Sequence, residues 1–244
     1  MSSASPRRTA EAPMSIKGFQ GTSLLDFPGR IASLIFFGRC NLSCGFCHNP
    51  ALVLAPDDLA DIPAAELLAD LAARRNFIDG VVISGGEPTL DPDLPRLLGE
   101  IKALGLEVKL DTNGLLPGVL QRLLDDRLVD YVALDLKTAP ARYRELHSIP
   151  VASANLLASL RLLLAAPVDY ELRTTCVPGL VEAADLRALG EQVRGARRWF
   201  LQQFVPHHAL SPELQTLAPH SPETLQGFAR MISAYVVEAG IRGL

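Results

Sequence analysis

Residues 40–50 read CNLSCGFCHNP and place three cysteines within eight positions of one another. The spacing of Cys40, Cys44 and Cys47 is C-x3-C-x2-C, and the fourth cysteine of the chain, Cys176, lies far downstream. Thiolates are preferred ligands of zinc and of iron–sulfur clusters, so this loop predicts a metal site. A cubane cluster held by three cysteines leaves one iron without a protein ligand, free to bind a substrate or cofactor.

A non-catalytic zinc module is the rival interpretation of this loop. A structural zinc site is usually closed by four protein ligands. His48 could supply the fourth, but it directly follows Cys47, and adjacent residues do not easily turn onto one small ion. We therefore favour an iron–sulfur cluster, and we expect Cys176 to be a small core residue.

Outward from this loop, strand-like and helix-like segments alternate along the chain. Short apolar or β-branched runs predict strands at 31–37, 80–84, 106–110, 131–136, 169–175 and 199–205, and a shorter strand is expected before the turn at DFPG. Leucines at helical spacing fill the gaps, and Ser221-Pro222 begins a last helix. About six strand–helix units predict an α/β fold with right-handed crossovers. Because six units are too few for a closed eight-stranded barrel, we expect an open, partial parallel βα barrel.

The composition limits the setting and the partners of the protein. The chain has 244 residues, a formal net charge of −4 and 48% hydrophobic residues, which is enough for one large core. The sequence contains no long basic run that would predict nucleic-acid binding. It also contains no apolar run long enough to cross a membrane. The small, polar residues at 1–14 predict a disordered tail, followed by one domain over 15–244. Arg7 and Arg8 are not followed by the apolar segment of an export signal. We therefore expect a cytoplasmic protein.

Chemically distinctive residues follow each of the six predicted strands. In parallel α/β folds the carboxyl ends of the strands meet at one face, where active sites form. In strand order, these ends carry the three clustered cysteines, SGGEP (84–88), DTNG (111–114), Asp135 with Lys137, Arg173 with Thr175, and His207 with His208. Six such coincidences predict a single site across the mouth of the barrel.

Taken singly, these residues also have plainer interpretations. SGGEP alone would be a tight turn with a solvated acid, since glycines permit positive φ and close backbone approach. Asp111, Asp135 and Lys137 could form surface ion pairs, and two neighbouring carboxylates would repel unless a cation or a lysine lay between them. Consecutive histidines are usually solvated, and at most one of the two is expected to face a site. The combination favours the functional interpretation.

CNLSCGFC followed by SGGEP resembles the radical S-adenosylmethionine (SAM) superfamily, with the aromatic Phe46 just before the last cysteine. The resemblance implies a partial barrel and a four-iron, four-sulfur cluster on Cys40, Cys44 and Cys47. The amino and carboxylate groups of SAM would bind the open iron. It also implies that an external electron donor of flavodoxin or ferredoxin type reduces the cluster, that SAM is cleaved, and that the resulting radical takes a hydrogen atom from a substrate.

The segments at 18–50, 83–90, 109–114 and 131–137 are similar to the activating enzymes of glycyl-radical enzymes. The resemblance is strongest to the activating protein of anaerobic ribonucleoside-triphosphate reductase and covers residues 15–205. It implies that the substrate is the Cα of one glycine in the partner reductase. Two alternative functions remain. The chain could be the activase of another glycyl-radical enzyme, such as pyruvate formate-lyase, or a radical SAM enzyme that acts on a small molecule. With four cysteines in total, the chain is not of the subgroup with a ferredoxin-like insert.

The resemblance implies roles for individual residues around the cofactor. Phe46 would contact the adenine, and Lys137 the methionine carboxylate. Gly85, Gly86 and Glu87 would lie along the methionine amino group. The residues that match holders of a monovalent cation near the sulfonium are Asp111, Thr112 and Asp135. The remaining cofactor contacts that the resemblance implies are Asn113, Arg173 and His208.

Overall fold

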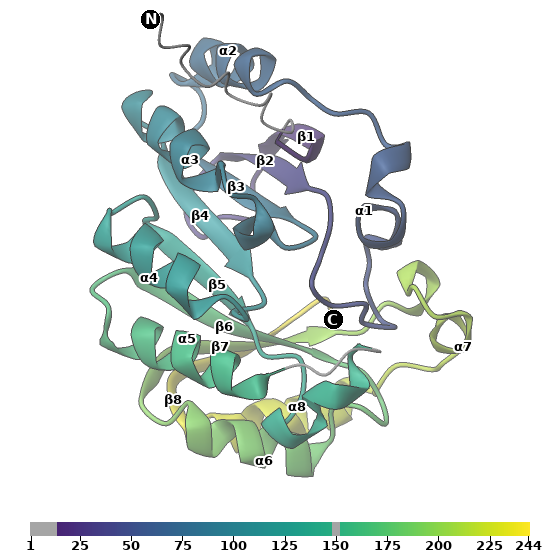
Figure 1. Ribbon diagram of the computed structural model, residues 1–244. Coiled ribbons are helices and arrows are strands. Elements are labelled where there is room, and N and C mark those ends of the chain that lie inside the picture. Colours follow the sequence, from purple (N-terminus) through teal and green to yellow (C-terminus); the bar gives the residue numbers. More distant parts are fainter. Residues whose placement is uncertain (1–13, 148–151) are drawn as a thin grey trace, which may run out of the picture.

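The computed structural model describes residues 14–147 and 152–244 (Figure 1). The predicted tail of residues 1–14 lies outside these ranges except for Met14, whose side chain packs into the main hydrophobic core. Within the described ranges eight strands form one sheet in chain order, namely β1 (Ile16–Ser23), β2 (Ala32–Phe37), β3 (Gly80–Gly85), β4 (Glu107–Thr112), β5 (Tyr131–Asp135), β6 (Asp169–Cys176), β7 (Ala196–Gln203) and β8 (Val236–Arg242). β1 is antiparallel to β2, and the later neighbours pair in parallel.

Helices connect the parallel strands and pack against one another along the outside of the sheet (Figure 1). The α-helices in the described part of the chain are α1 (Pro50–Leu54), α2 (Ala64–Arg74), α3 (Leu94–Ala103), α4 (Pro117–Asp125), α5 (Ser153–Ala165), α6 (Ala183–Gln192), α7 (Pro212–Gln215) and α8 (Pro222–Ile232). Short 3₁₀ turns are η1 (Pro56–Asp58), η2 (Pro88–Leu90), η3 (Pro140–Glu145) and η4 (Pro206–His208). None of the described helices is long and apolar enough to cross a bilayer.

The structure confirms the predicted open, partial barrel and adds one strand to it. The six predicted strands correspond to β2–β7. The strand expected before the DFPG turn is β1, which at 8 residues is longer than the 6-residue β2 and not shorter. The sequence analysis did not predict β8, which extends the parallel sheet beyond β7. Its sequence, VVEAGIR, mixes charges and a glycine with apolar residues, so it lacks the continuous apolar run of a buried parallel strand.

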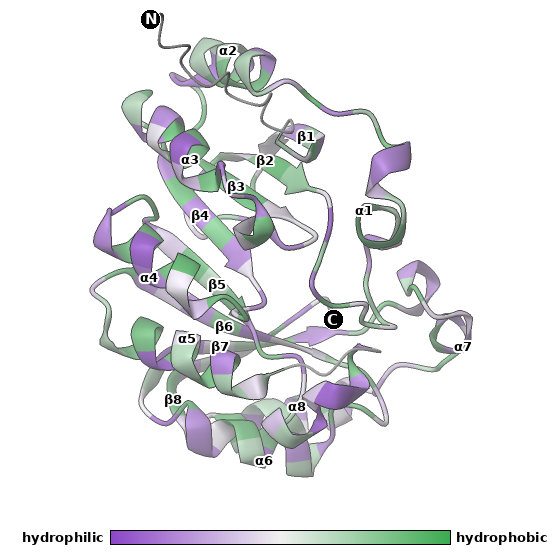
Figure 2. Cartoon of the chain, in the orientation of Figure 1, coloured by the Kyte–Doolittle hydropathy of each residue, from purple (hydrophilic) through white to green (hydrophobic). Residues whose placement is uncertain are grey.

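The two faces of the sheet have different chemistry because side chains alternate along each strand. In Figure 2 the ribbon of β4 alternates between hydrophobic and hydrophilic residues. Val108 and Leu110 are fully buried in the main core, which the sheet forms with the helices. Lys109 and Asp111 lie on the opposite, inner face of the same strand, where they form an ion pair. The barrel interior is therefore charged near β4, and this charge borders the site.

Candidate active site

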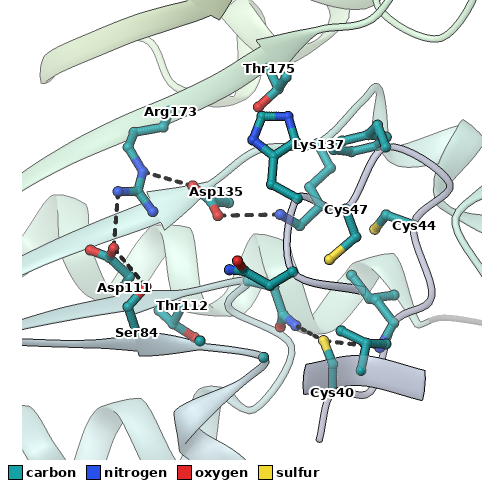
Figure 3. Close-up of a pocket in the computed structure, with 18 of the residues that line it drawn as sticks. Cys40, Cys44, Cys47, Ser84, Asp111, Thr112, Asp135, Lys137, Arg173 and Thr175 are labelled. Carbon is teal, nitrogen blue, oxygen red and sulfur yellow. Dashed lines mark hydrogen bonds and ion pairs between the residues drawn. The ribbon is translucent and has the colours of Figure 1, made fainter. Parts of the chain in front are cut away.

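The predicted site residues converge on one cavity of about 250 Å³ at the carboxyl ends of the parallel strands (Figure 3). The predicted residues that line it are Cys40, Cys44, Phe46, Cys47, Gly85, Gly86, Asp111, Thr112, Asn113, Asp135, Lys137 and Arg173. Two predicted residues, Glu87 and His208, do not line the cavity. Ser84 and Thr175, which the sequence analysis placed at the strand ends, also line the cavity. Lining residues that it did not assign to the site are Leu42, His48, Asn49, Val53 and Gln202.

The cysteine loop is held against the end of β3 by two backbone hydrogen bonds. The Gly86 N–H donates to the Phe37 carbonyl, and the Glu87 N–H donates to the Arg39 carbonyl, both at 2.8 Å. Gly85 has φ of +117°, a conformation that L residues with side chains rarely adopt. A Cβ on Gly86 would lie 1.9 Å from the Arg39 carbonyl oxygen. The double glycine is therefore required by the close approach of these two backbones.

Glu87, which was expected beside the methionine amino group, is buried behind the cavity wall with 1% of its surface exposed. Its carboxylate accepts hydrogen bonds from the Asn113 N–H at 2.8 Å, from the Thr112 hydroxyl at 2.8 Å and from the Thr89 N–H at 3.2 Å. Burial raises the pKa of this carboxyl, and the hydrogen bonds oppose the shift. Because both oxygens are occupied by neighbours, Glu87 ties the end of β3 to the end of β4 in this structure.

Asn113 fixes the cysteine loop from the β4 side of the cavity. Its side-chain N–H donates to the Asn41 side-chain oxygen at 2.6 Å. Farther along the loop, the Ser211 N–H donates to the Gly45 carbonyl at 2.7 Å. The Ser43 hydroxyl lies 2.7 Å from the His147 ring. The loop is thus pinned from three separate segments of the chain, which gives its cysteines a defined place.

A chain of ion pairs forms the opposite wall of the cavity (Figure 3). The Arg173 guanidinium donates to Asp135 at 2.8 Å and to Asp111 at 3.2 Å. Lys137 donates to the other oxygen of Asp135 at 3.2 Å, and Lys109 pairs with Asp111. Because Arg173 and Asp135 are neighbours in the register of β5 and β6, the bridge follows directly from strand pairing.

These partners keep both carboxylates ionised. Burial alone would raise the pKa of Asp111, but the Arg173 and Lys109 charges more than offset it and lower that pKa. The pKa of Asp135 is lowered to about 2, because Arg173 and Lys137 outweigh the same burial effect. The wall therefore carries fixed charges of both signs at neutral pH.

The Arg173 guanidinium occupies the space between Asp111 and Asp135 where a monovalent cation was expected. Two carboxylates that close together need a positive charge between them, and the chain supplies it. The residues in this arrangement therefore do not fit an additional cation.

We accordingly expect cofactor binding to be insensitive to the monovalent cation of the buffer. Exchange of potassium or sodium for choline at constant ionic strength should leave the SAM dissociation constant within about twofold, since Arg173 already neutralises the carboxylates. Equilibrium binding measurements on the iron–sulfur-loaded protein check this. A dissociation constant that rises steeply in choline and recovers on adding potassium would contradict it.

Comparison with known proteins places the chain in a family. Residues 34–188 match the model of the radical SAM superfamily. That match covers more than half of the chain and includes the cysteine loop, SGGEP, DTNG and Arg173. The chain belongs to the radical SAM superfamily. It is therefore an enzyme of the family that binds a four-iron, four-sulfur cluster and SAM.

Individual radical SAM relatives cover most of this chain. A Methanocaldococcus jannaschii protein named as a glycyl-radical enzyme activating enzyme is 30% identical over 93% of this chain and 95% of its own length. The pyruvate formate-lyase-activating enzyme of Streptococcus mutans is 29% identical over 76% of this chain and 74% of its own. In fold, the chain is similar to Streptococcus suis SuiB bound to SAM, with a TM-score of 0.64 and 17% identity over 85% of this chain. This chain spans about half, 51%, of the SuiB chain.

The three cavity cysteines fit the cluster of a radical SAM enzyme. Cys40, Cys44 and Cys47 line the same cavity, whereas Cys176 is fully buried on β6 and does not. Among the described residues, no group of three or more His, Cys, Asp or Glu side chains is placed to hold a single metal ion. The thiolates of a cubane cluster bind three different irons and so need not converge on one point. Three thiols in one cavity match a cluster with one open iron.

Burial disfavours the thiolate forms of Cys40 and Cys44. It raises the pKa of Cys40 to about 12 and that of Cys44 to about 11, and the nearby Lys137 charge opposes both shifts. Metal ligation requires the thiolate, so cluster assembly must release these protons. Lys137 also lies 5.9 Å from the ring centroid of Phe46, which brings the positive wall next to the cysteine loop.

The histidines lie at the rim of the radical SAM site. His208 is exposed on η4, and its ring centroid is 6.0 Å from that of His48, which does line the cavity. The VPHHAL segment therefore places its histidines outside the cavity, and the histidine that follows Cys47 is the one inside. Gln202 occupies an inward position near the end of β7, so strand alternation carried to the end of that strand could have found it.

Proposed function

We propose that this radical SAM enzyme is the activase of an anaerobic ribonucleoside-triphosphate reductase and acts in the cytoplasm. The observation that carries the proposal is the single cavity that joins three thiols to the Lys137 and Arg173 charges. Support for an activase comes from the relative that matches 93% of this chain and is named as a glycyl-radical enzyme activating enzyme. The motif resemblance of the segments around the cysteine loop supports the reductase as the target.

In this proposal the chain positions the cofactor and balances its charge. When the cluster and SAM are bound, reductive cleavage of SAM supplies a 5′-deoxyadenosyl radical that removes a hydrogen atom from a glycine Cα. Lys137, fixed by Asp135, binds the methionine carboxylate as a point charge. Phe46, which lines the cavity, would pack against the adenine, and Gly85 and Gly86 would bring their backbone close to the bound cofactor. The open sheet leaves room for a glycine-bearing loop of the reductase to enter.

The test is the appearance of a glycyl radical in the candidate partner. The reconstituted, reduced enzyme with SAM is mixed anaerobically with the large reductase subunit, and electron paramagnetic resonance is recorded. We expect a protein-bound glycyl signal, with one 5′-deoxyadenosine formed per radical, and no signal in a reductase whose candidate glycine is alanine. SAM cleavage without a radical in the reductase would exclude this target.

A second candidate target is a pyruvate formate-lyase-like enzyme. The observation that favours it is the 29% identity to the Streptococcus mutans activating enzyme over 76% of this chain. The same resonance experiment with a formate-lyase-type partner separates the two targets. A flavodoxin or ferredoxin is the proposed electron donor, and its replacement of chemical reductant in this assay tests that part.

A further inference from the structure

A carboxylate that the proposed chemistry does not use lies inside the barrel, below the cavity. Glu171, on β6, has only 1% of its surface exposed. Its two oxygens accept hydrogen bonds from the two terminal nitrogens of Arg242 at 2.9 and 2.6 Å. The Tyr131 hydroxyl donates to it at 3.1 Å. A buried carboxylate is tolerated only when it is paired in this manner.

β8 is shaped to deliver Arg242 to this position. The guanidinium carbon of Arg242 lies 4.1 Å from the ring centroid of Phe200, on the neighbouring β7. Phe200 pairs in register with Gly240, and a Cβ on Gly240 would come within 2.9 Å of the ring. The glycine therefore makes room for the aromatic ring on which the arginine packs, an arrangement that favours a cation.

Glu171 shares its surroundings with the ion pairs of the cavity wall. It lies two residues before Arg173 on β6, so both side chains point to the inner face of the sheet. Burial would raise the pKa of Glu171, but Arg242 first, and then Arg173 and Lys109, lower it. Arg173 and Lys109 are the two cations that hold Asp111. The ionised forms of Glu171 and Asp111 are therefore both stabilised by the positive charges of Arg173 and Lys109.

We propose that Arg242 is a positioning residue for the SAM site, which acts by neutralising Glu171 so that Arg173 and Lys109 stay with Asp111 and Asp135. Arg242 does not line the cavity. Without Arg242, the buried Glu171 carboxylate attracts Arg173 and Lys109 away from the carboxylates of the cavity wall. The wall that faces the cofactor then loses its charge balance. The C-terminal strand thereby sets the cofactor affinity from outside the cavity. This inference needs SAM binding alone and does not depend on which protein is the target.

The first test is SAM binding to the iron–sulfur-loaded Arg242→Ala variant. Loss of partners behind a site commonly costs 10–100-fold, and we expect the SAM dissociation constant to rise by roughly tenfold. Arg242→Lys, which keeps the charge, should recover part of the affinity. The matched control is Arg197→Ala on β7, which removes an arginine whose partner, Asp169, is exposed and leaves no buried carboxylate behind. The control should bind SAM as the parent does.

A second variant separates positioning from a general loss of structure. In Glu171→Gln/Arg242→Ala the buried charge is gone, so Arg173 is not diverted, and the parent affinity should return. If Arg242→Ala fails to fold, Glu171→Gln and this double variant decide the matter, and both should bind SAM as the parent does. Parent affinity in a folded Arg242→Ala variant, an equal loss in Arg197→Ala, or a folded double variant that stays weak would overturn the proposal.

Discussion

Replacement of Cys44 by alanine should abolish SAM cleavage. Cys44 lines the cavity with Cys40 and Cys47, and a cubane cluster cannot be held there by two thiolates with the site geometry intact. We expect reconstituted iron and sulfide to fall to a small fraction of the parent value, and 5′-deoxyadenosine to fall to background. Metal and sulfide analysis together with product quantification under anaerobic, reducing conditions measures both.

The chain contains a matched control for this variant. Cys176→Ala removes a thiol of the same type that is fully buried on β6 and lies outside the cavity. It should cost about 1 kcal/mol of stability for the lost packing and leave cluster content and SAM cleavage unchanged. Full cluster loading in Cys44→Ala, or loss of the cluster in Cys176→Ala, would contradict the assignment of the three ligands. If the parent protein takes up one zinc ion and no sulfide, the rival interpretation as a non-catalytic zinc module would be correct.

The order of the strands and the identity of most cavity residues followed from local patterns. Buried parallel strands have short apolar runs as their sequences. The polar residue that ends each run must lie at the edge of the sheet where the carboxyl ends of the strands meet. For this reason Cys40, Asp111, Asp135 and Arg173 could be expected to share one cavity, and they do. The strand order alone could not predict which charged side chains of the cavity form ion pairs with one another.

The contacts that the sequence analysis did not predict have a common physical origin, because each joins residues far apart in the chain. Arg173 bridges Asp111, 62 positions away, and this pairing depends on the register of three strands. Glu87 looked like a free acceptor because its partners at Thr112 and Asn113 come from another strand end. β8 was missed because VVEAGIR lacks a continuous apolar run, and the ion pair of its Arg242 with Glu171, 71 positions earlier, could not be read from the sequence. A local pattern records the period of a strand, while ion-pair partners are set by the tertiary fold.

Replacement of Gly86 by alanine should separate the cysteine loop from β3. The new Cβ would lie 1.9 Å from the backbone oxygen of Arg39, which cannot rotate away as a side chain could. Overpacking of this kind costs about 3 kcal/mol or more, and the strain is most easily relieved by a shift of the loop that begins at Cys40. A displacement near 1 Å at a reacting centre can cost roughly 100-fold in rate, so we expect 5′-deoxyadenosine formation to fall by about that factor.

Gly99→Ala is the matched control for this second variant. Gly99 lies within α3, and its new Cβ would come no closer than 3.9 Å to the Leu128 side chain. Alanine at an interior helix position is favoured over glycine by about 0.5–1 kcal/mol, so this variant should melt at the same or a higher temperature with unchanged activity. Thermal unfolding, iron content and product formation of the two variants are compared side by side. A Gly86→Ala protein with parent iron content and parent rate would show that the loop does not depend on this close approach.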